Sequence, residues 1–83
     1  MKKTFILLSI GEVSAKGNVT LKISYKKGLI KQTLYILADE ADTKTLKVGA
    51  DISDMMPENF VIRTSILIGE DGQEIVTKWI ELI

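Results

Sequence analysis

Lysines and two tyrosines lie between Asn18 and Leu37, and these residue types suggest contact with a polyanion. Ammonium groups pair with phosphates, and the flat ring of Tyr35 offers a surface for base stacking, worth roughly 1–3 kcal/mol per base. A second combination of this kind, Arg63 with Trp79, lies nearer the C-terminus. The candidate nucleic-acid-binding residues are Lys16, Lys22, Lys26, Lys27, Lys31, Tyr35, Arg63 and Trp79.

Each of these residues also has an ordinary structural explanation. Single lysines often lie on the solvated edge of a sheet, where they discourage aggregation. Tyr35 is equally suited to a contact between proteins. For Trp79 the core or a dimer interface is the favoured explanation, because lone tryptophans usually bury most of their area. The binding interpretation therefore depends on the cluster of lysines rather than on any one of them.

The stretch from Asn18 to Leu37 predicts a β-hairpin, because apolar and polar residues alternate on both sides of a Lys27-Gly28 turn. A two-residue turn at this point places Lys26 opposite Leu29. The apolar side chains then share one face, and a slip of one residue would mix the two sets. The pairs that this register predicts on the polar face are Ser24 with Lys31, Lys22 with Thr33, and Thr20 with Tyr35.

Three further segments have strand character. Thr4 to Ile10 is apolar on both sides, whereas Phe60 to Ile68 and Glu74 to Leu82 predict a hairpin with Arg63 opposite Trp79. Residues 38–59 show no regular pattern. Five strands predict one all-β domain over residues 1–83, a small five-stranded OB-like barrel, because closure removes exposed edges. An SH3-like barrel is the alternative.

The composition excludes several kinds of chemistry. The chain has no cysteine and no histidine, so it offers no disulfide, no thiolate and no histidine-based triad or zinc centre. Its acidic runs lack the spacing of a calcium-binding loop, and no glycine-rich phosphate loop is present. We therefore expect no enzymatic activity, no catalytic residue, no metal and no cofactor.

The charges cancel in number but not in position. Eleven basic residues balance eleven acidic ones, yet most lysines lie between Lys2 and Lys31, whereas ten of the acids lie from Asp39 onward. Such asymmetry indicates a side that faces a polyanion. The apolar run from Phe5 to Ile10 is too short for a secretory signal or a membrane span. We expect a soluble cytoplasmic protein (in the host cytoplasm if viral) without a membrane partner.

The segment Ser14-Ala15-Lys16-Gly17-Asn18, between the first two expected strands, is similar to the Ser-x-x-Gly-Lys/Asn segment of filamentous-phage single-stranded-DNA-binding (helix-destabilising) proteins. Later blocks follow the same order as in that family. A hairpin whose second strand ends in Leu34 to Asp39 is followed by an irregular stretch with Pro57 and by a final hairpin that turns at a glycine. The resemblance implies an OB-like barrel, a two-fold dimer and cooperative coating of single-stranded DNA during phage DNA replication. The chain departs from the family at Val19-Thr20, where Pro-Tyr is usual, and in its zero net charge.

Two functions remain open at this point. The first is sequence-independent binding of single-stranded DNA, with RNA as an alternative polynucleotide, in a groove of lysines and aromatic rings on the central hairpin. The second is a small β-barrel protein–protein interaction module, such as a phage or plasmid accessory protein, that does not bind nucleic acid. A homodimer is expected in addition, because the apolar residues exceed what one small interior accommodates. The residues behind that expectation are Val61, Leu67, Ile75 and Ile80.

Overall fold

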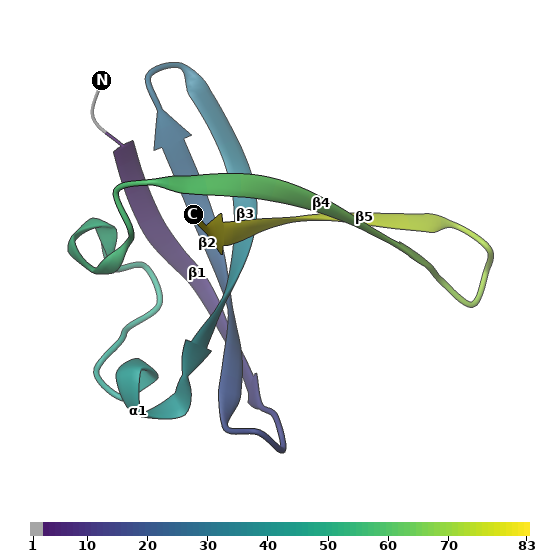
Figure 1. Cartoon of the computed structure of the whole chain (residues 1–83), viewed down its shortest axis with the longest axis horizontal. Helices are drawn as coiled ribbons and strands as arrows, with labels where there is room; N and C mark the ends of the chain where they lie inside the picture. Colours follow the sequence, from purple (N-terminus) through teal and green to yellow (C-terminus); the bar gives the residue numbers. More distant parts are fainter. Residues whose placement is uncertain (1–2) are drawn as a thin grey trace.

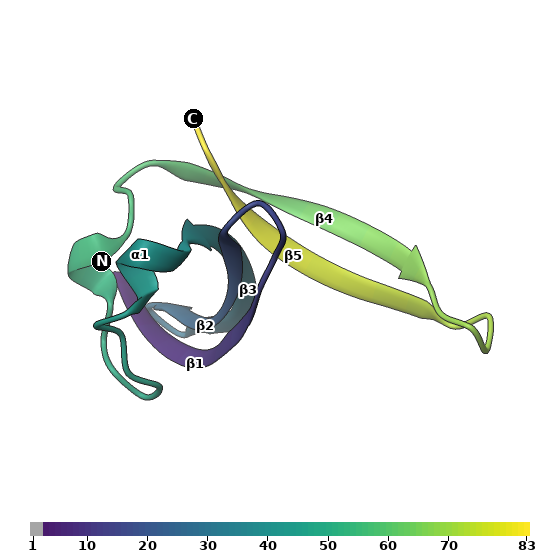
Figure 2. The same cartoon turned by 90° about the horizontal axis from the view of Figure 1, so that it is seen from below.

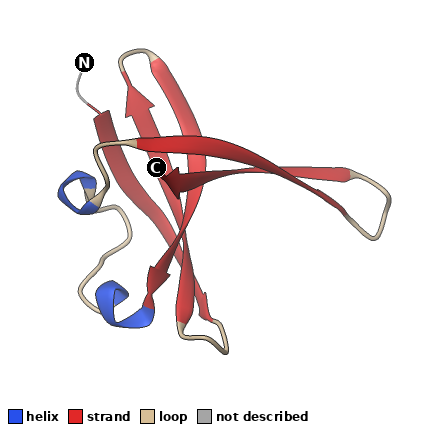
Figure 3. Ribbon diagram, in the orientation of Figure 1, coloured by secondary structure: helices blue, strands red, loops and turns tan. Residues whose placement is uncertain are grey.

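Strands make up most of the chain and join in a single sheet, seen in a computed structural model that describes residues 3–83 (Figures 1 and 3). The elements in chain order are β1 (Lys3–Val13), β2 (Asn18–Lys27), β3 (Ile30–Asp39), α1 (Glu40–Thr43), η1 (Ser53–Met55), β4 (Phe60–Ile68) and β5 (Glu74–Leu82). The all-β prediction is confirmed. Lys2, which contributes to the basic half of the sequence, lies outside the described residues.

The sheet curls but stays open. Its strand order is β1-β2-β3-β5-β4, with every neighbouring pair antiparallel except β3 and β5, which run parallel. Figure 2 shows β1, β2 and β3 curving around the space beside α1, while the β4–β5 hairpin extends away from them. Within residues 3–83, the outer strands β1 and β4 do not pair with each other. The fold is therefore small, all-β and barrel-like, with an opening between its two edges.

One hydrophobic core fills the inner face of this curl. On β2, every second residue from Val19 to Tyr25 is buried and the residues between them are not, as strand geometry requires. Phe5 stacks on Tyr25 with ring centroids 4.9 Å apart, and Phe60 meets both rings edge-on. The buried side chains are Phe5, Leu7, Val19, Leu21, Ile23, Tyr25, Leu34, Ile52 and Ile80.

The irregular segment 38–59 covers the free edge of β1, a role that its sequence does not reveal. Backbone hydrogen bonds join Leu7 to Gly49 and Ala50, and Ile52 donates to the carbonyl of Phe5. The segment thereby satisfies an edge that would otherwise invite pairing with another chain. Its helix α1 has only four residues, and no helix in the described part of the chain is long and apolar enough to cross a membrane.

The β2–β3 hairpin has the predicted faces but a different register. Its turn is Gly28-Leu29, flanked by the pair Lys27–Ile30, so the ladder is displaced by two residues from the expected one. The φ of Gly28 is 62°, whereas the φ of Leu29 is not positive. This combination fits a type II′ turn, because a type I′ turn needs a positive φ at both central residues. Because strands have a period of two, this displacement leaves every side chain on its predicted face.

The C-terminal hairpin has the predicted register throughout. Arg63 lies opposite Trp79, and the ladder continues to Ile68 opposite Glu74. Gly69 donates a 2.8 Å backbone hydrogen bond to Gln73, which closes the expected three-residue loop, and Gly72 has a φ of 79° there. We call the part of this hairpin beyond the Arg63–Trp79 pair, residues 64–78, the arm. It projects from the sheet past the end of the core (Figure 1).

We expect truncation on the inner face of β3 to cost much more free energy of unfolding than truncation on its outer face. Leu34 is fully buried, so Leu34→Ala should lower the free energy of unfolding by about 2–5 kcal/mol through lost burial and a residual cavity. The control is Leu37→Ala on the same strand, because Leu37 points to the opposite face and is 58% exposed; its cost should be less than about 1 kcal/mol. Urea denaturation followed by circular dichroism measures both. Equal losses would contradict this assignment of faces.

Candidate nucleic-acid interface

Four of the predicted binding residues form a single row across the outer face of the sheet, the face opposite the core. Lys22 on β2 pairs with Tyr35 on β3, Tyr35 pairs with Trp79 on β5, and Trp79 pairs with Arg63 on β4. Neighbouring strands lie about 4.8 Å apart, so the row spans roughly 15 Å. Two aromatic rings are thus placed between two cationic side chains, and we call these four residues the cation–aromatic row.

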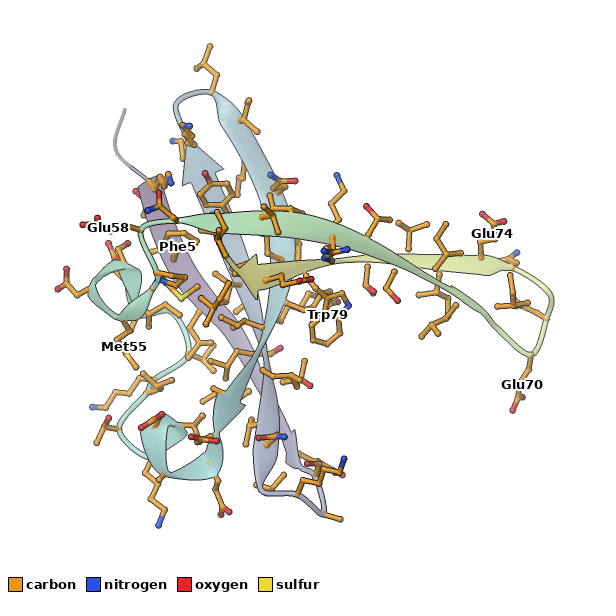
Figure 4. The ribbon with its side chains drawn as sticks, in the orientation of Figure 1. Phe5, Met55, Glu58, Glu70, Glu74 and Trp79 are labelled. Carbon is orange, nitrogen blue, oxygen red and sulfur yellow. The ribbon has the colours of Figure 1, made fainter. Side chains whose placement is uncertain are left out.

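The aromatic pair is the centre of the row. The rings of Tyr35 and Trp79 lie 5.4 Å apart between centroids, with planes inclined by 34°. The indole Nε1 of Trp79 donates a 2.9 Å hydrogen bond to Oγ1 of Thr77, which fixes the orientation of the indole on its own strand. Both rings are half-buried, and Trp79 does not belong to the buried core. Figure 4 shows Trp79 near the place where the β4–β5 hairpin crosses β3.

Lys26 and Lys31 extend the same face toward the hairpin turn. The corrected register places them directly opposite each other, and both are exposed. Like charges at opposed positions of a ladder destabilise the pair. Within residues 3–83, the single ion pair that forms joins Arg63 to Glu81, so neither lysine has a carboxylate partner. An anion bound between Lys26 and Lys31 would relieve their repulsion.

The other two predicted lysines lie elsewhere. Lys27 is paired with Lys3 and Ile30 and belongs to the opposite parity from Lys26, so it is directed away from the row. Lys16 is in the turn between β1 and β2, near the end of β2 remote from Lys26. An extended chain between Lys16 and Lys22 covers roughly 20 Å. The structure therefore brings together six of the eight candidates on one face, and separates Lys16 and Lys27 from them.

Arg63 is the most constrained cation of the row. Its Nε forms an ion pair with the carboxylate of Glu81, which lies two residues along β5 from Trp79 on the same face. The two side chains are 69% and 48% exposed, so solvent screens the pair and its contribution to stability is small. A phosphate would have to share Arg63 with Glu81. Lys22, by contrast, has no acidic partner within residues 3–83.

A shallow hollow opens beside the row where β3 and β5 diverge. Because these strands pair at Tyr35–Trp79 alone, their N-terminal halves separate and leave a space of about 390 Å³. Lys78 lines this hollow together with Lys22 and was not among the predicted residues, since the parallel contact between β3 and β5 has no local sequence signal. The lining residues are Lys22, Gln32, Thr33, Tyr35, Val76, Thr77 and Lys78.

A larger hollow, of about 510 Å³, lies on the other side of the molecule and is unsuited to a polyanion. Its lining is mostly apolar, including Leu46, Met55 and Met56 from the segment that covers the core. The charged residues in that lining are Asp39 and Asp42, which would repel phosphate. In residues 3–83, no group of histidine, cysteine, aspartate and glutamate side chains is arranged to hold a metal ion.

Comparison with protein-family models, with curated proteins and with solved structures yields no match to this chain. The resemblance to filamentous-phage DNA-binding proteins therefore stays a prediction from a short segment and the order of blocks. The case for a function rests on the geometry of the outer face.

A double-mutant cycle should show that Tyr35 and Trp79 stabilise each other. Tyr35→Leu and Trp79→Leu remove an aromatic pair worth about 0.5–1.5 kcal/mol beyond its buried area. We expect the double variant to lose less free energy of unfolding than the sum of the single variants by that amount. Chemical denaturation followed by circular dichroism provides the values. Thr20→Ala is the control partner, because β3 separates Thr20 from β5, and its effect should add to that of Trp79→Leu. Additive effects for Tyr35 and Trp79 would refute the coupling.

Proposed function

We propose that this protein binds single-stranded DNA without sequence preference, along the outer face of its sheet. The observation that carries the proposal is the cation–aromatic row, in which Tyr35 and Trp79 lie between Lys22 and Arg63. Unpaired bases stack on aromatic rings whatever their identity, while cations on both sides meet the phosphates. RNA satisfies the same chemistry and is the alternative polynucleotide.

The row suits single strands better than duplex. Its rings need an exposed base face, and the bases of a duplex are already stacked on one another. Between the row and Lys26, the described residues of the outer face are Ser24 and Thr33, rather than the asparagine or glutamine side chains that read the edges of adenine. Affinity would come from stacking and from phosphates, neither of which depends on the identity of the base.

Segregated charge supports a polyanionic ligand despite the zero net charge. Lys22, Lys26 and Lys31 share one face, and their nearest positions in the ladders are Ser9, Tyr35, Thr4 and one another rather than acids. Local potential, rather than net charge, attracts a flexible strand. A role in coating DNA during phage replication in the host cytoplasm, as the sequence resemblance implies, is compatible with this surface and forms part of the proposal.

The salt dependence of binding distinguishes this proposal from the alternative, a protein-interaction module that does not bind nucleic acid. We expect oligo-dT labelled with a fluorophore to bind at low salt, with log affinity falling linearly in log salt by about 0.7 per phosphate neutralised. Fluorescence anisotropy at several salt concentrations measures the slope, and oligo-dA and mixed-sequence strands test sequence independence. No binding at low salt would eliminate the DNA-binding proposal. Strong preference for one sequence would eliminate its sequence-independent form.

Substitutions within the row should lower affinity by distinct routes. Tyr35→Leu removes a stacking surface and should cost roughly 1–3 kcal/mol of binding free energy, whereas Tyr35→Phe keeps the ring and should bind nearly as the unchanged protein does. Lys22→Ala should reduce the salt slope by about 0.7. The matched control is Lys47→Ala, an exposed lysine on the segment near the opposite edge of the sheet. Tyr35→Leu binding as tightly as Tyr35→Phe would exclude stacking.

A further inference from the structure

The hollow of about 510 Å³ on the core side of the sheet has the size of a small-molecule site. Such sites measure roughly 300–1,000 Å³. The hollow reaches down to the hydrophobic core, because the buried residues Leu21 and Ile52 belong to its lining. The sheet leaves this end accessible, since β1 and β4 do not pair within residues 3–83 and α1, which lies beside the curl, has only four residues (Figure 2).

The wall of this hollow is mainly apolar and comes from segments distant in the sequence. β2, β3, the end of β5 and the segment that covers β1 all contribute to it. Ile36 and Leu46 are half-buried and pack against the core, whereas Met55 is 56% exposed and lies farther out. Methionine side chains are flexible and polarisable, so they adapt to ligands of different shape and contact aromatic rings favourably. The wall therefore suits the apolar body of an organic molecule.

The charges in the lining are both negative and gather at α1. Asp39 precedes the first residue of α1 and Asp42 lies within its single turn; residues three apart lie on the same side of a helical turn. Within residues 3–83 neither carboxylate has an ion-pair partner. Aspartate is among the best N-cap residues, yet Asp39 makes no capping hydrogen bond to α1. Both carboxylates are therefore available to a ligand.

We propose that this hollow binds a small organic cation, whose apolar body contacts the wall and whose ammonium or guanidinium group meets Asp39 and Asp42. Ligand sites combine this kind of apolar wall with a few polar groups that fix the orientation of the ligand. Charge complementarity selects the sign, because an anion would be repelled and a neutral molecule would leave the two carboxylates uncompensated. A hydrated inorganic cation would satisfy the carboxylates but not the apolar wall.

The proposed site is separate from the cation–aromatic row. None of the four residues of the row contributes to its lining, and the row lies on the opposite face of the sheet. The inference therefore does not rest on DNA binding, and either proposal can fail without the other. A ligand in the hollow contacts β3, α1, the covering segment and the end of β5 at once, and binding to the folded chain alone stabilises it.

Three probes with similar bodies test the preference for a cation. Phenylbutylamine, phenylbutanol and phenylbutyrate share a phenyl ring on a short chain but end in a positive, a neutral and a negative group. We expect phenylbutylamine to bind with a millimolar dissociation constant, as befits so small a ligand. The alcohol should bind at least about fivefold more weakly and the acid more weakly still. Heteronuclear NMR titration measures the affinities, and the amide signals of Leu46 and Ile52 should shift while those of Lys22 and Tyr35 should not.

Substitutions at the rim test the role of the carboxylates. Asp39→Asn combined with Asp42→Asn should weaken phenylbutylamine about tenfold, through the loss of two exposed ion pairs, and leave phenylbutanol within about twofold. The matched control is Glu70→Gln with Glu74→Gln, which removes two exposed charges from the β4–β5 hairpin and should change nothing. Met55→Lys places a cation in the wall and should reverse the preference, so that phenylbutyrate binds better than phenylbutylamine. Circular dichroism confirms that each variant is folded.

Several outcomes would overturn the proposal. One is the lack of any shift at the hollow with phenylbutylamine up to roughly 20 mM, well above the affinity expected of such a ligand. Equal affinity for phenylbutylamine and phenylbutyrate, or unchanged affinity in the double aspartate variant, would remove the basis for a cation site. Signals of the hollow that shift with protein concentration alone, without a probe, would show that a second copy of the chain covers it instead.

Discussion

The structure depends on the point where the C-terminal hairpin meets the N-terminal sheet. β3 and β5 pair at one position, Tyr35 with Trp79, and their rings lie against each other on the outer face. The next residue on β5, Ile80, points the opposite way and is buried in the core. Two successive residues of β5 thus anchor the hairpin at this junction of β3 and β5, which we call the joint: Trp79 contacts Tyr35 on the outer face, and Ile80 packs in the core on the inner face. Without this joint the hairpin would be a separate two-stranded ribbon, which is marginal in water.

The same joint creates the candidate binding surface. Aligning Trp79 with Tyr35 brings Arg63 and Lys22 into line, although these cations are far apart in the sequence and on different strands. It also makes β3 and β5 diverge, which opens the hollow beside the row. The protein therefore places opposed lysines beside two half-buried rings on one face, and the repulsion between the lysines is a local cost of the kind often found where an arrangement serves a ligand. Acidic residues lie mostly in the second half of the chain, at the arm tip and along the covering segment (Figure 4).

The two edges of the open sheet are treated differently. The edge of β1 is hydrogen-bonded by residues 49–52, which form part of a segment without regular structure. Ile52 from that segment enters the core, so the same stretch protects an edge and completes the interior. At the other side, β4 carries exposed apolar residues into the arm. Exposed apolar surface on a projecting hairpin normally marks a contact with another molecule. The fold differs from a closed barrel because β1 and β4 do not pair with each other within residues 3–83.

The sequence by itself determined which residues share a face. Alternation has a period of two in any strand, so Lys22, Lys31 and Tyr35 were correctly placed on one side, and the short loop at Gly72 set the register of β4 and β5 correctly. Alternation cannot distinguish registers that differ by two residues, because both keep the same faces. The predicted register of β2 and β3 was therefore wrong by two residues, although the faces were right. Tertiary structure alone decided that Tyr35 meets Trp79, that Lys78 borders the hollow, and that residues 49–52 cover β1. Those contacts join segments distant in the chain through packing and backbone hydrogen bonds, for which no local pattern exists.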